Sequence, residues 1–241
     1  MLNQQTAQFW DEFASEYYAI QQETFTTITT DIAHYLEKIG VLPTQDFVDL
    51  AGGYGKYIPT ILPYVGKYYL VDFSKEMLQL AETLYPKPNI ERILTTQTEF
   101  FTYSATNQYD CVFSALNPAM RQIEEVIQAL RISERYACFV ELVSDTEELF
   151  TEIEPITQTK EAQLFLTNVT RFATDQGIPW HKKRFTYTTQ TMIEKTFALD
   201  YFAEDIQQDP TVLAKIESFY QGKESREVCH EVQFELVVLV K

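Results

Sequence analysis

A short stretch near residue 50 combines the residue types of a turn that holds a small molecule. In FVDLAGGYGKY (47–57), an apolar run contains Asp49 and then meets Gly52, Gly53 and Gly55. Glycine has no side chain, so a backbone that contains it can turn sharply and come close to a ligand. Turns of this kind hold nucleotides or nucleosides at the end of a strand. The stretch therefore predicts a cofactor site.

The glycine spacing separates two kinds of cofactor. The dinucleotide fingerprint G-x-G-x-x-G needs a third glycine, which lets the following helix pack closely against the strand. Gly53 and Gly55 match the first two positions, but Ile58 occupies the third. The turn also follows a long helical pattern (1–39) instead of opening the chain. This spacing disfavours a bound pyrophosphate and favours a nucleoside that carries an amino acid.

The turn is expected at one edge of a parallel sheet. Short apolar runs alternate with helical patterns, and the expected strands are 47–51, 67–73, 90–96, 109–116 and 135–142. Near-continuous apolar strands that alternate with helices form a parallel sheet covered on both faces. Ligands of such sheets lie beyond the carboxyl ends of the strands, where the strand order reverses. That edge would carry the glycine turn, Asp72, and the residues at 97–99 and 114–118.

The pattern changes after Leu142. The expected elements are a helical stretch broken by Pro155, a lone strand, two helices and a long final strand, at 144–177, 183–189, 191–199, 210–221 and 229–241. The strict alternation of strand and helix has ended in this part of the chain. It is therefore expected to add an insertion before the sheet receives its last strands.

Composition limits the partners and the compartment. The formal net charge is −16, and an acidic field repels phosphate backbones, which disfavours nucleic acid as a partner. The three cysteines lack C-x-x-C spacing and are expected to be buried, reduced thiols. The sequence starts without a signal-peptide pattern, and no apolar run is long enough to span a bilayer. We expect a cytoplasmic protein without a membrane partner that binds small molecules.

Four stretches resemble class I S-adenosylmethionine-dependent methyltransferases of the small-molecule type. VDLAGGYGKY resembles their first motif, with Ala51 in place of its first glycine, and LVDFSKEMLQLA (70–81) resembles their second motif. FWDEFASEY (9–17) resembles the helix that leads into the core, and YDCVFSALNPAM (109–120) resembles the motif of the fourth strand. The resemblance runs from residue 9 to about residue 142, in order and at the usual spacing.

The resemblance implies S-adenosylmethionine as the cofactor. Asp72 would accept hydrogen bonds from both ribose hydroxyls, because one carboxylate can accept two at once. Phe73 and Met77 would enclose the adenine. The implied cofactor-binding residues are Tyr17, Asp49, Ala51, Gly52, Gly53, Gly55, Asp72, Phe73, Met77, Gln97, Thr98, Glu99, Ser114, Ala115 and Leu116. The group at 97–99 would meet the adenine edge, and the group at 114–116 would border the methionine end.

Catalysis is expected to need little from the protein. The sulfonium of the cofactor is already a strong electrophile, so orienting a nucleophile in line with its methyl group can suffice. A base is needed only where the acceptor must lose a proton. The candidates near the site are Tyr17, Tyr18, Asn117 and His181, and no group has the spacing of metal ligands.

The expected fold class is α/β, a Rossmann-like doubly wound and mostly parallel seven-stranded sheet with an inserted, mainly helical cap. Residues 1–40 would be helices covering the cofactor site, and 41–143 the S-adenosylmethionine-binding core. Residues 144–189 would be the cap and 190–241 the end of the core sheet, all in one integrated domain. With Trp180, the cap is expected to close over the cofactor and shape an aromatic acceptor pocket.

The expected function is methyl transfer to a small-molecule acceptor. One alternative is an NAD-dependent oxidoreductase, which Ile58 disfavours. Another is a non-catalytic protein that binds S-adenosylmethionine or S-adenosylhomocysteine and has lost turnover. Cofactor titration distinguishes the oxidoreductase from the methyltransferase, and only detection of a methylated product distinguishes the non-catalytic binder.

Overall fold

A single twisted sheet organises the molecule. The computed structural model describes the backbone of residues 2–153 and 158–241, and the side chains of residues 7–151 and 160–241. In this part of the chain the strand order is β3-β2-β1-β4-β5-β7-β6, with β7 antiparallel to both of its neighbours and the first five strands parallel. The strands are β1 (Thr44–Leu50), β2 (Val65–Asp72), β3 (Ile90–Leu94), β4 (Tyr109–Ala115), β5 (Ser133–Glu147), β6 (Trp180–Glu194) and β7 (Ser225–Val240). The predicted seven-stranded, mostly parallel, doubly wound sheet is confirmed.

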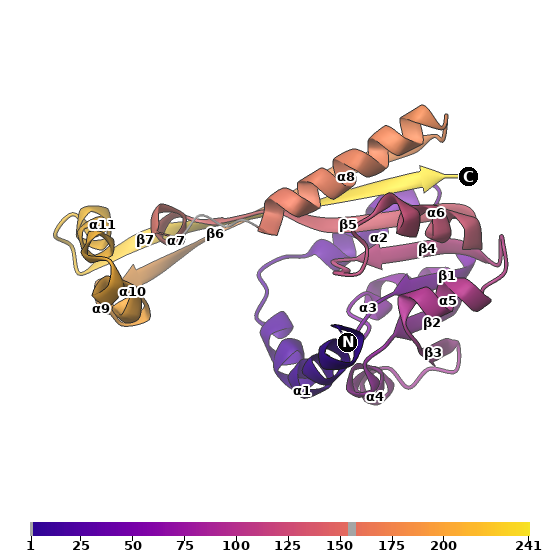
Figure 1. Ribbon diagram of the computed structural model, residues 1–241, viewed down its shortest axis with the longest axis horizontal. Coiled ribbons are helices and arrows are strands. Elements are labelled where there is room, and N and C mark those ends of the chain that lie inside the picture. Colours follow the sequence, from indigo (N-terminus) through magenta and orange to yellow (C-terminus); the bar gives the residue numbers. More distant parts are fainter. Residues whose placement is uncertain (1, 154–157) are drawn as a thin grey trace.

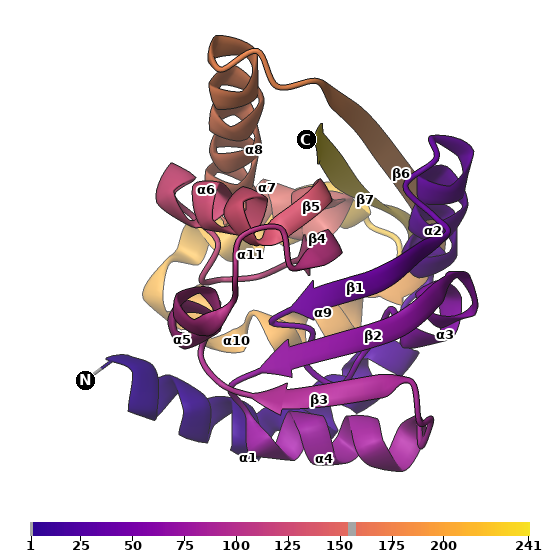
Figure 2. The same cartoon turned by 90° about the vertical axis from the view of Figure 1, so that its right-hand side faces the viewer.

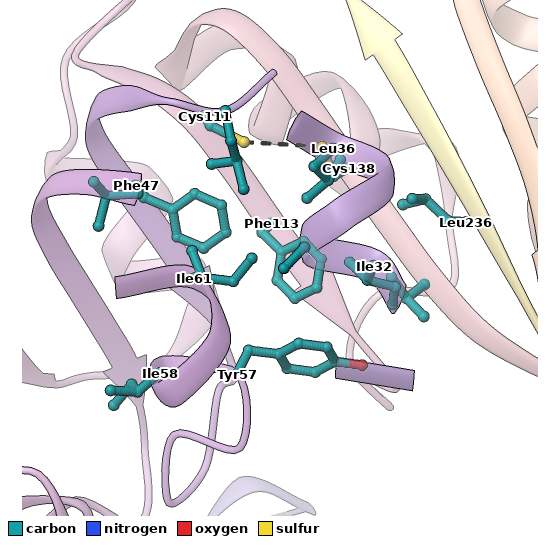
Figure 3. Close-up of a cluster of buried hydrophobic side chains, with 14 of the residues drawn as sticks. Ile32, Leu36, Phe47, Tyr57, Ile58, Ile61, Cys111, Phe113, Cys138 and Leu236 are labelled. Atoms are coloured by element: carbon teal, nitrogen blue, oxygen red, sulfur yellow. Dashed lines mark hydrogen bonds between the residues drawn. The ribbon is translucent and has the colours of Figure 1, made fainter. Parts of the chain in front are cut away.

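Helices cover both faces of this sheet, as its apolar strands require (Figure 2). On one face lie α2 (Ile28–Lys38), α3 (Ile58–Ile61), the 3₁₀ turn η1 (Leu62–Tyr64) and α4 (Lys75–Leu84). On the other lie α5 (Gln97–Tyr103), α6 (Ile123–Ile132) and α8 (Gln158–Asp175). Figure 3 shows the first of these cores, where Ile32 and Leu36 of α2 meet Phe47 and Phe113 of the sheet.

The sheet reverses direction between β1 and β4. The chain builds outward from β1 to β2 and β3, and then returns to place β4 on the other side of β1. The loops after β1 and β4 therefore leave in opposite directions and open a crevice at the carboxyl ends of the strands. The glycine turn and the loop at 114–118 form the two sides of this switch point.

The N-terminal helix lies across that edge. α1 (Leu2–Gln22) packs Ala14 against Tyr54 and Met77, and Asp11 accepts a hydrogen bond from the Ser74 hydroxyl at 2.6 Å. The helical pattern at 1–39 predicted one continuous helical region, but the chain breaks at 23–27 before α2 begins. Threonines at 24, 26 and 27 form local side-chain hydrogen bonds there, which compete with helical geometry.

The last three strands extend beyond the sheet core as an arm, which we define as residues 144–153 and 186–233 (Figure 1). Its tip carries α7 (Glu148–Ile153), α9 (Lys195–Tyr201), α10 (Ala203–Gln208) and α11 (Pro210–Tyr220), which enclose a separate apolar cluster. At its base, the Tyr187 hydroxyl donates to Asp31 of α2 at 2.6 Å. No helix among residues 2–153 and 158–241 has the length and apolar character needed to cross a membrane.

The segment 144–189 is therefore not the closing cap that its sequence pattern predicts. It contains the end of β5, α7, α8 and the first part of β6. α8 packs Phe165, Leu166 and Val169 onto the sheet face formed with α5 and α6. Pro155, expected to break the helical stretch, lies outside the described residues.

Candidate functional site

The turn after β1 has the backbone geometry that its glycines predict. Gly53 and Gly55 have φ values of 57° and 80°, in the left-handed region that favours glycine. Ala51 also has a φ of 57°, so it takes the left-handed conformation that a glycine would adopt more easily. A side chain at Gly55 would collide with Ile58, so this glycine is required for packing within the turn. It does not face the crevice.

Asp72 joins the two motifs that the sequence singles out. Its two carboxylate oxygens accept hydrogen bonds from the backbone N–H groups of Gly53 and Ser74, each at 2.8 Å. The residue is 6% exposed, and burial raises the pKa of its carboxyl group, an effect that these two hydrogen bonds oppose. Each carboxylate oxygen can accept more than one hydrogen bond, so both can still accept from a ligand. Asp72 thus holds the glycine turn and presents two acceptors to the crevice.

Asp49 is a second buried carboxyl group beneath the turn. Burial raises its pKa to about 7, while the hydrogen bond from the Tyr68 hydroxyl at 2.6 Å acts in the opposite direction and nearby Asp72 raises the pKa further. A β-carbon at Gly52 would lie 2.6 Å from the Asp49 carboxylate, so only glycine fits there. The carboxyl group of Asp49 therefore changes charge near neutral pH, next to the crevice.

A cavity of about 880 Å³ fills the switch point. It lies between the turn after β1, the end of β2, the start of α5 and the loop after β4. Thirteen of the residues named from the sequence line it: Tyr17, Asp49, Ala51, Gly52, Gly53, Asp72, Phe73, Met77, Gln97, Thr98, Ala115, Leu116 and Asn117. None of the lining residues comes from the described parts of this segment, 144–151 and 160–189, which corrects the expectation that it closes the site.

Two further residues expected at the cofactor do not line the cavity. Glu99 forms a capping box with Thr96, and its carboxylate accepts hydrogen bonds from the Thr96 backbone and hydroxyl at 3.2 and 2.9 Å. The capping box pairs backbone N–H groups at the start of α5 and turns the Glu99 side chain away from the crevice. Ser114 is buried behind the loop, where its hydroxyl accepts a hydrogen bond from the Asn117 amide at 3.0 Å.

The four candidate catalytic residues lie in different places. Tyr17 lines the cavity, and burial followed by the charge of Asp72 raises its pKa, so its phenol stays protonated near neutral pH. Tyr18 packs edge-on against the ring of Tyr54 and lies outside the cavity lining. His181 lies on β6, three strands from β4, or roughly 14 Å at about 4.8 Å per strand spacing. Neither Tyr18 nor His181 is positioned for catalysis at this cavity.

Asn117 lines the cavity, but its side-chain amide is already hydrogen-bonded within the protein. Its amide nitrogen donates to Gln97 at 2.8 Å and to Ser114 at 3.0 Å, and its amide oxygen accepts from the backbone of Ala119 at 2.9 Å. Leu116, just before it, has a φ of 52°, which is rare for a bulky residue. Strained backbone of this kind persists where surrounding bonds hold it, often at functional sites. Asn117 is therefore a positioning residue for the loop after β4.

Among the cavity residues that were not predicted, three lie within the quoted glycine stretch. Tyr54, Lys56 and Tyr57 project from the turn and line the cavity. Both tyrosines are almost fully buried, at 3% and 5% exposure. The signal was present in the sequence as two aromatic residues and a lysine among the glycines. What it lacked was the direction in which each side chain leaves the turn.

The comparisons with known proteins agree with this geometry. Residues 48–138 match the family model described as a methyltransferase domain. No curated protein matches the chain. Similar solved structures include the YcgJ protein of Bacillus subtilis, with 11% identity, a TM-score of 0.52, and coverage of 87% of this chain and 97% of that one. A putative methyltransferase of Bacillus halodurans is 12% identical, with a TM-score of 0.51 and coverage of 87% and 98%.

A third similar structure is an S-adenosylmethionine-dependent methyltransferase of Aquifex aeolicus, with 14% identity, a TM-score of 0.50, and coverage of 89% of this chain and 95% of that one. At such identities a structural likeness establishes the fold alone. The domain match covers β1 to the middle of β5, which contains the glycine turn, Asp72 and the loop after β4. The matched domain and the cavity therefore coincide.

Proposed function

We propose that this class I S-adenosylmethionine-dependent methyltransferase transfers the methyl group to a small-molecule acceptor. The observation that carries the proposal is the cavity at the switch point, with the Asp72 carboxylate presented to it. Its volume of about 880 Å³ lies in the range of roughly 300–1,000 Å³ that is usual for pockets holding drug-sized ligands. Such a cavity can hold a nucleoside cofactor beside a small acceptor.

The residues of the cavity fit the cofactor. Asp72 has the free acceptor positions that two ribose hydroxyls need. Phe73 and Met77 offer apolar surfaces for the adenine, and Gln97 and Thr98 offer polar groups for its edge. The small residues of the turn leave its backbone open to the methionine part. The cofactor, once bound, would supply an electrophilic methyl group on a sulfonium.

The protein would contribute position more than proton transfer. Tyr17 keeps its proton near neutral pH, so it can orient an acceptor by hydrogen bonding but is a poor base. The strained loop at Leu116 and Asn117 would hold one wall of the site in place. The acceptor would therefore be one whose reacting atom already carries an available lone pair.

A small acceptor is favoured over nucleic acid by charge. The chain carries 35 acidic and 19 basic residues, and this field repels a phosphate backbone. The cavity lining contains two cationic side chains, of which Arg131 is bonded to backbone carbonyls of Phe101 and Ser104. That arrangement offers no basic track for a polynucleotide. A cytoplasmic location is part of the proposal, because free thiols such as Cys111 and Cys138 are usual in a reducing compartment.

Calorimetry with S-adenosylhomocysteine and with NAD tests the cofactor, and mass detection of methylated products from a metabolite extract tests turnover. The proposal expects binding of S-adenosylhomocysteine, no binding of NAD, and at least one methylated product of low mass. Binding of NAD alone would support the oxidoreductase. Binding of S-adenosylhomocysteine without any product, with both small molecules and RNA offered, would support the non-catalytic binder.

A further inference from the structure

The outermost strand of the sheet leaves one long edge open. β6 ends the strand order, and among residues 2–153 and 158–241 it pairs with β7 alone. Much of it lies in the arm, which projects from the core (Figure 1). It runs for 15 residues, whereas most strands in globular proteins have about five or six. A free edge presents a row of unpaired backbone N–H and C=O groups, which can bind another strand.

The features that usually block such an edge are missing from most of β6. Natural proteins protect their edges with lysines, prolines, bulges or very short strands. Residues 185–193 (FTYTTQTMI) contain no charged residue, proline or glycine, and most of them are aromatic or β-branched. The pairing of β6 with β7 runs from Trp180 to Glu194 without a shift in register. A long, regular and uncharged edge of this kind is expected to be covered by another strand.

The side chains of β6 leave room for that strand. Alternate residues of a strand share one face, and the even-numbered residues from Lys182 to Glu194 are all exposed. On the opposite face, Phe185 is buried and its ring lies edge-on to Tyr35 of α2, with the ring centroids 6.2 Å apart. A further strand could therefore pair with the backbone edge without disturbing the core.

The charges at the two ends of β6 are complementary to each other. At the core end, Lys182 and Arg184 both bind Glu235, at 2.6 and 3.0 Å, so two cations share one carboxylate. At the tip end, Glu194 is exposed and forms no ion pair within the described residues. An antiparallel second copy of the same strand brings these opposite ends together. The edge is therefore complementary to itself.

The backbone limits the register of such a pair. Along a strand the N–H and C=O groups of successive residues point to opposite edges, so the two-fold axis must pass through a residue and not between two. An axis at Thr188 places Lys182 opposite Glu194 of the second copy at both ends. An axis one residue further along places Lys183 opposite Lys195, which is unfavourable. The charges therefore favour a pair centred on Thr188.

We infer that a second copy of this chain pairs with the open edge of β6, antiparallel and about a two-fold axis at Thr188. The pairing joins the two sheets into one, and a two-fold contact closes the assembly at two copies. It places the start of α9 of each copy beside the core end of the other β6. Phe197 and Tyr201 of α9 are 51% and 59% exposed, which offers apolar surface for this contact.

Sedimentation velocity over a range of protein concentrations tests the inference, and the wild type is expected to form a dimer. In the proposed register Thr186 lies opposite Gln190 of the second copy. The double variant Thr186→Lys/Gln190→Lys sets lysine against lysine twice and should weaken the dimer by about tenfold or more. Thr186→Glu/Gln190→Glu should do the same. An equal mixture of the two variants should restore a dimer at least as tight as the wild type, because each lysine then faces a glutamate.

Gln79→Lys/Thr83→Lys is the matched control, since it changes the same exposed residue types at the same spacing on α4 and should leave the dimer intact. Circular dichroism checks that each variant is folded, and misfolded chains could not restore a dimer on mixing. A wild type that stays monomeric at every concentration would overturn the inference and leave the edge to a strand of another protein. Two double variants that dimerise like the wild type would also overturn it, as would a mixture that stays monomeric. None of these outcomes depends on the proposed function, because no cofactor is involved.

Discussion

Replacing Asp72 with asparagine is the sharpest test of how the site is built. The carboxylate accepts from the backbone N–H groups of Gly53 and Ser74, both at 2.8 Å. An amide has one oxygen, so its NH₂ group must face one of these two N–H donors. The substitution therefore removes one hydrogen bond and leaves a buried donor unsatisfied. The expected loss in the free energy of unfolding is about 1–3 kcal/mol, measured by urea denaturation.

The same variant should lose affinity for the cofactor. Hydrogen bonds to charged groups contribute about 1.5–3 kcal/mol, and Asp72→Asn removes the charge that two ribose hydroxyls would share. At about 1.4 kcal/mol per tenfold, the loss of one such bond predicts S-adenosylhomocysteine binding weaker by roughly 10- to 150-fold. Calorimetry at 25 °C measures this, with circular dichroism to establish that the variant is folded.

A matched change outside the cavity provides the control. Asp46 lies on β1 and accepts a hydrogen bond from the Tyr69 hydroxyl at 3.0 Å, but it does not line the cavity. Asp46→Asn should therefore leave the affinity within a factor of about two. The reasoning is refuted if folded Asp72→Asn binds S-adenosylhomocysteine as tightly as the wild type.

Four further predictions follow from the backbone, the charge and the topology. Ala51→Gly should raise the free energy of unfolding by roughly 0.5–1 kcal/mol in urea denaturation, because relief of left-handed strain exceeds the added chain entropy; a loss would contradict this. With its pKa at about 7, Asp49 is mostly neutral at pH 6 and mostly charged at pH 8, and S-adenosylmethionine is a cation. Calorimetry should therefore show binding roughly tenfold weaker at pH 6 than at pH 8. Asp49→Asn should remove this dependence on pH. Because the pKa of folded Asp49 lies above its ordinary value, folding takes up a proton between about pH 4 and pH 7. The Asp49 contribution to the free energy of unfolding should therefore decrease as the pH rises through this range. Asp49→Asn should remove this decrease. Trp180→Ala should cost about 1–2 kcal/mol of stability in urea denaturation, since the residue is only 39% exposed, and should leave cofactor affinity unchanged. Altered acceptor selectivity would place Trp180 at the site after all.

Much of the matched domain at 48–138 could be predicted because its signals are contiguous. The turn needs left-handed residues directly after a strand, and Gly53 and Gly55 supply them within a few positions. Ser74 is a residue type that favours the start of a helix, and its hydroxyl accepts from the Met77 backbone N–H at 3.2 Å. Parallel strands with helical crossovers bring their carboxyl ends together, so Asp72 could be assigned to the same edge as the turn.

The direction of individual side chains was harder to predict. Glu99 and Ser114 lie at the expected edge, but neighbouring groups compete for them. Thr96 binds Glu99 in a capping box, and Asn117 binds Ser114 behind its loop. Tyr54, Lys56 and Tyr57 were overlooked for the converse reason. A tight turn sends successive side chains in directions that depend on its φ values, which residue types do not specify.

The sequence by itself determined the strand-turn-helix order and the acidic residues at the ends of the strands, because these depend on neighbours a few positions apart. Only the tertiary structure decided how the strands pair and where α8 packs after residue 142. Glu147 of β5 pairs with His230, and Glu194 of β6 pairs with Ser225, across loops that no local periodicity describes. Pairings this distant in the chain formed the arm and placed α8 on the sheet face that also carries α5 and α6. Strand pairing is set by which edges remain open once the core has formed, and that is a property of the assembled sheet.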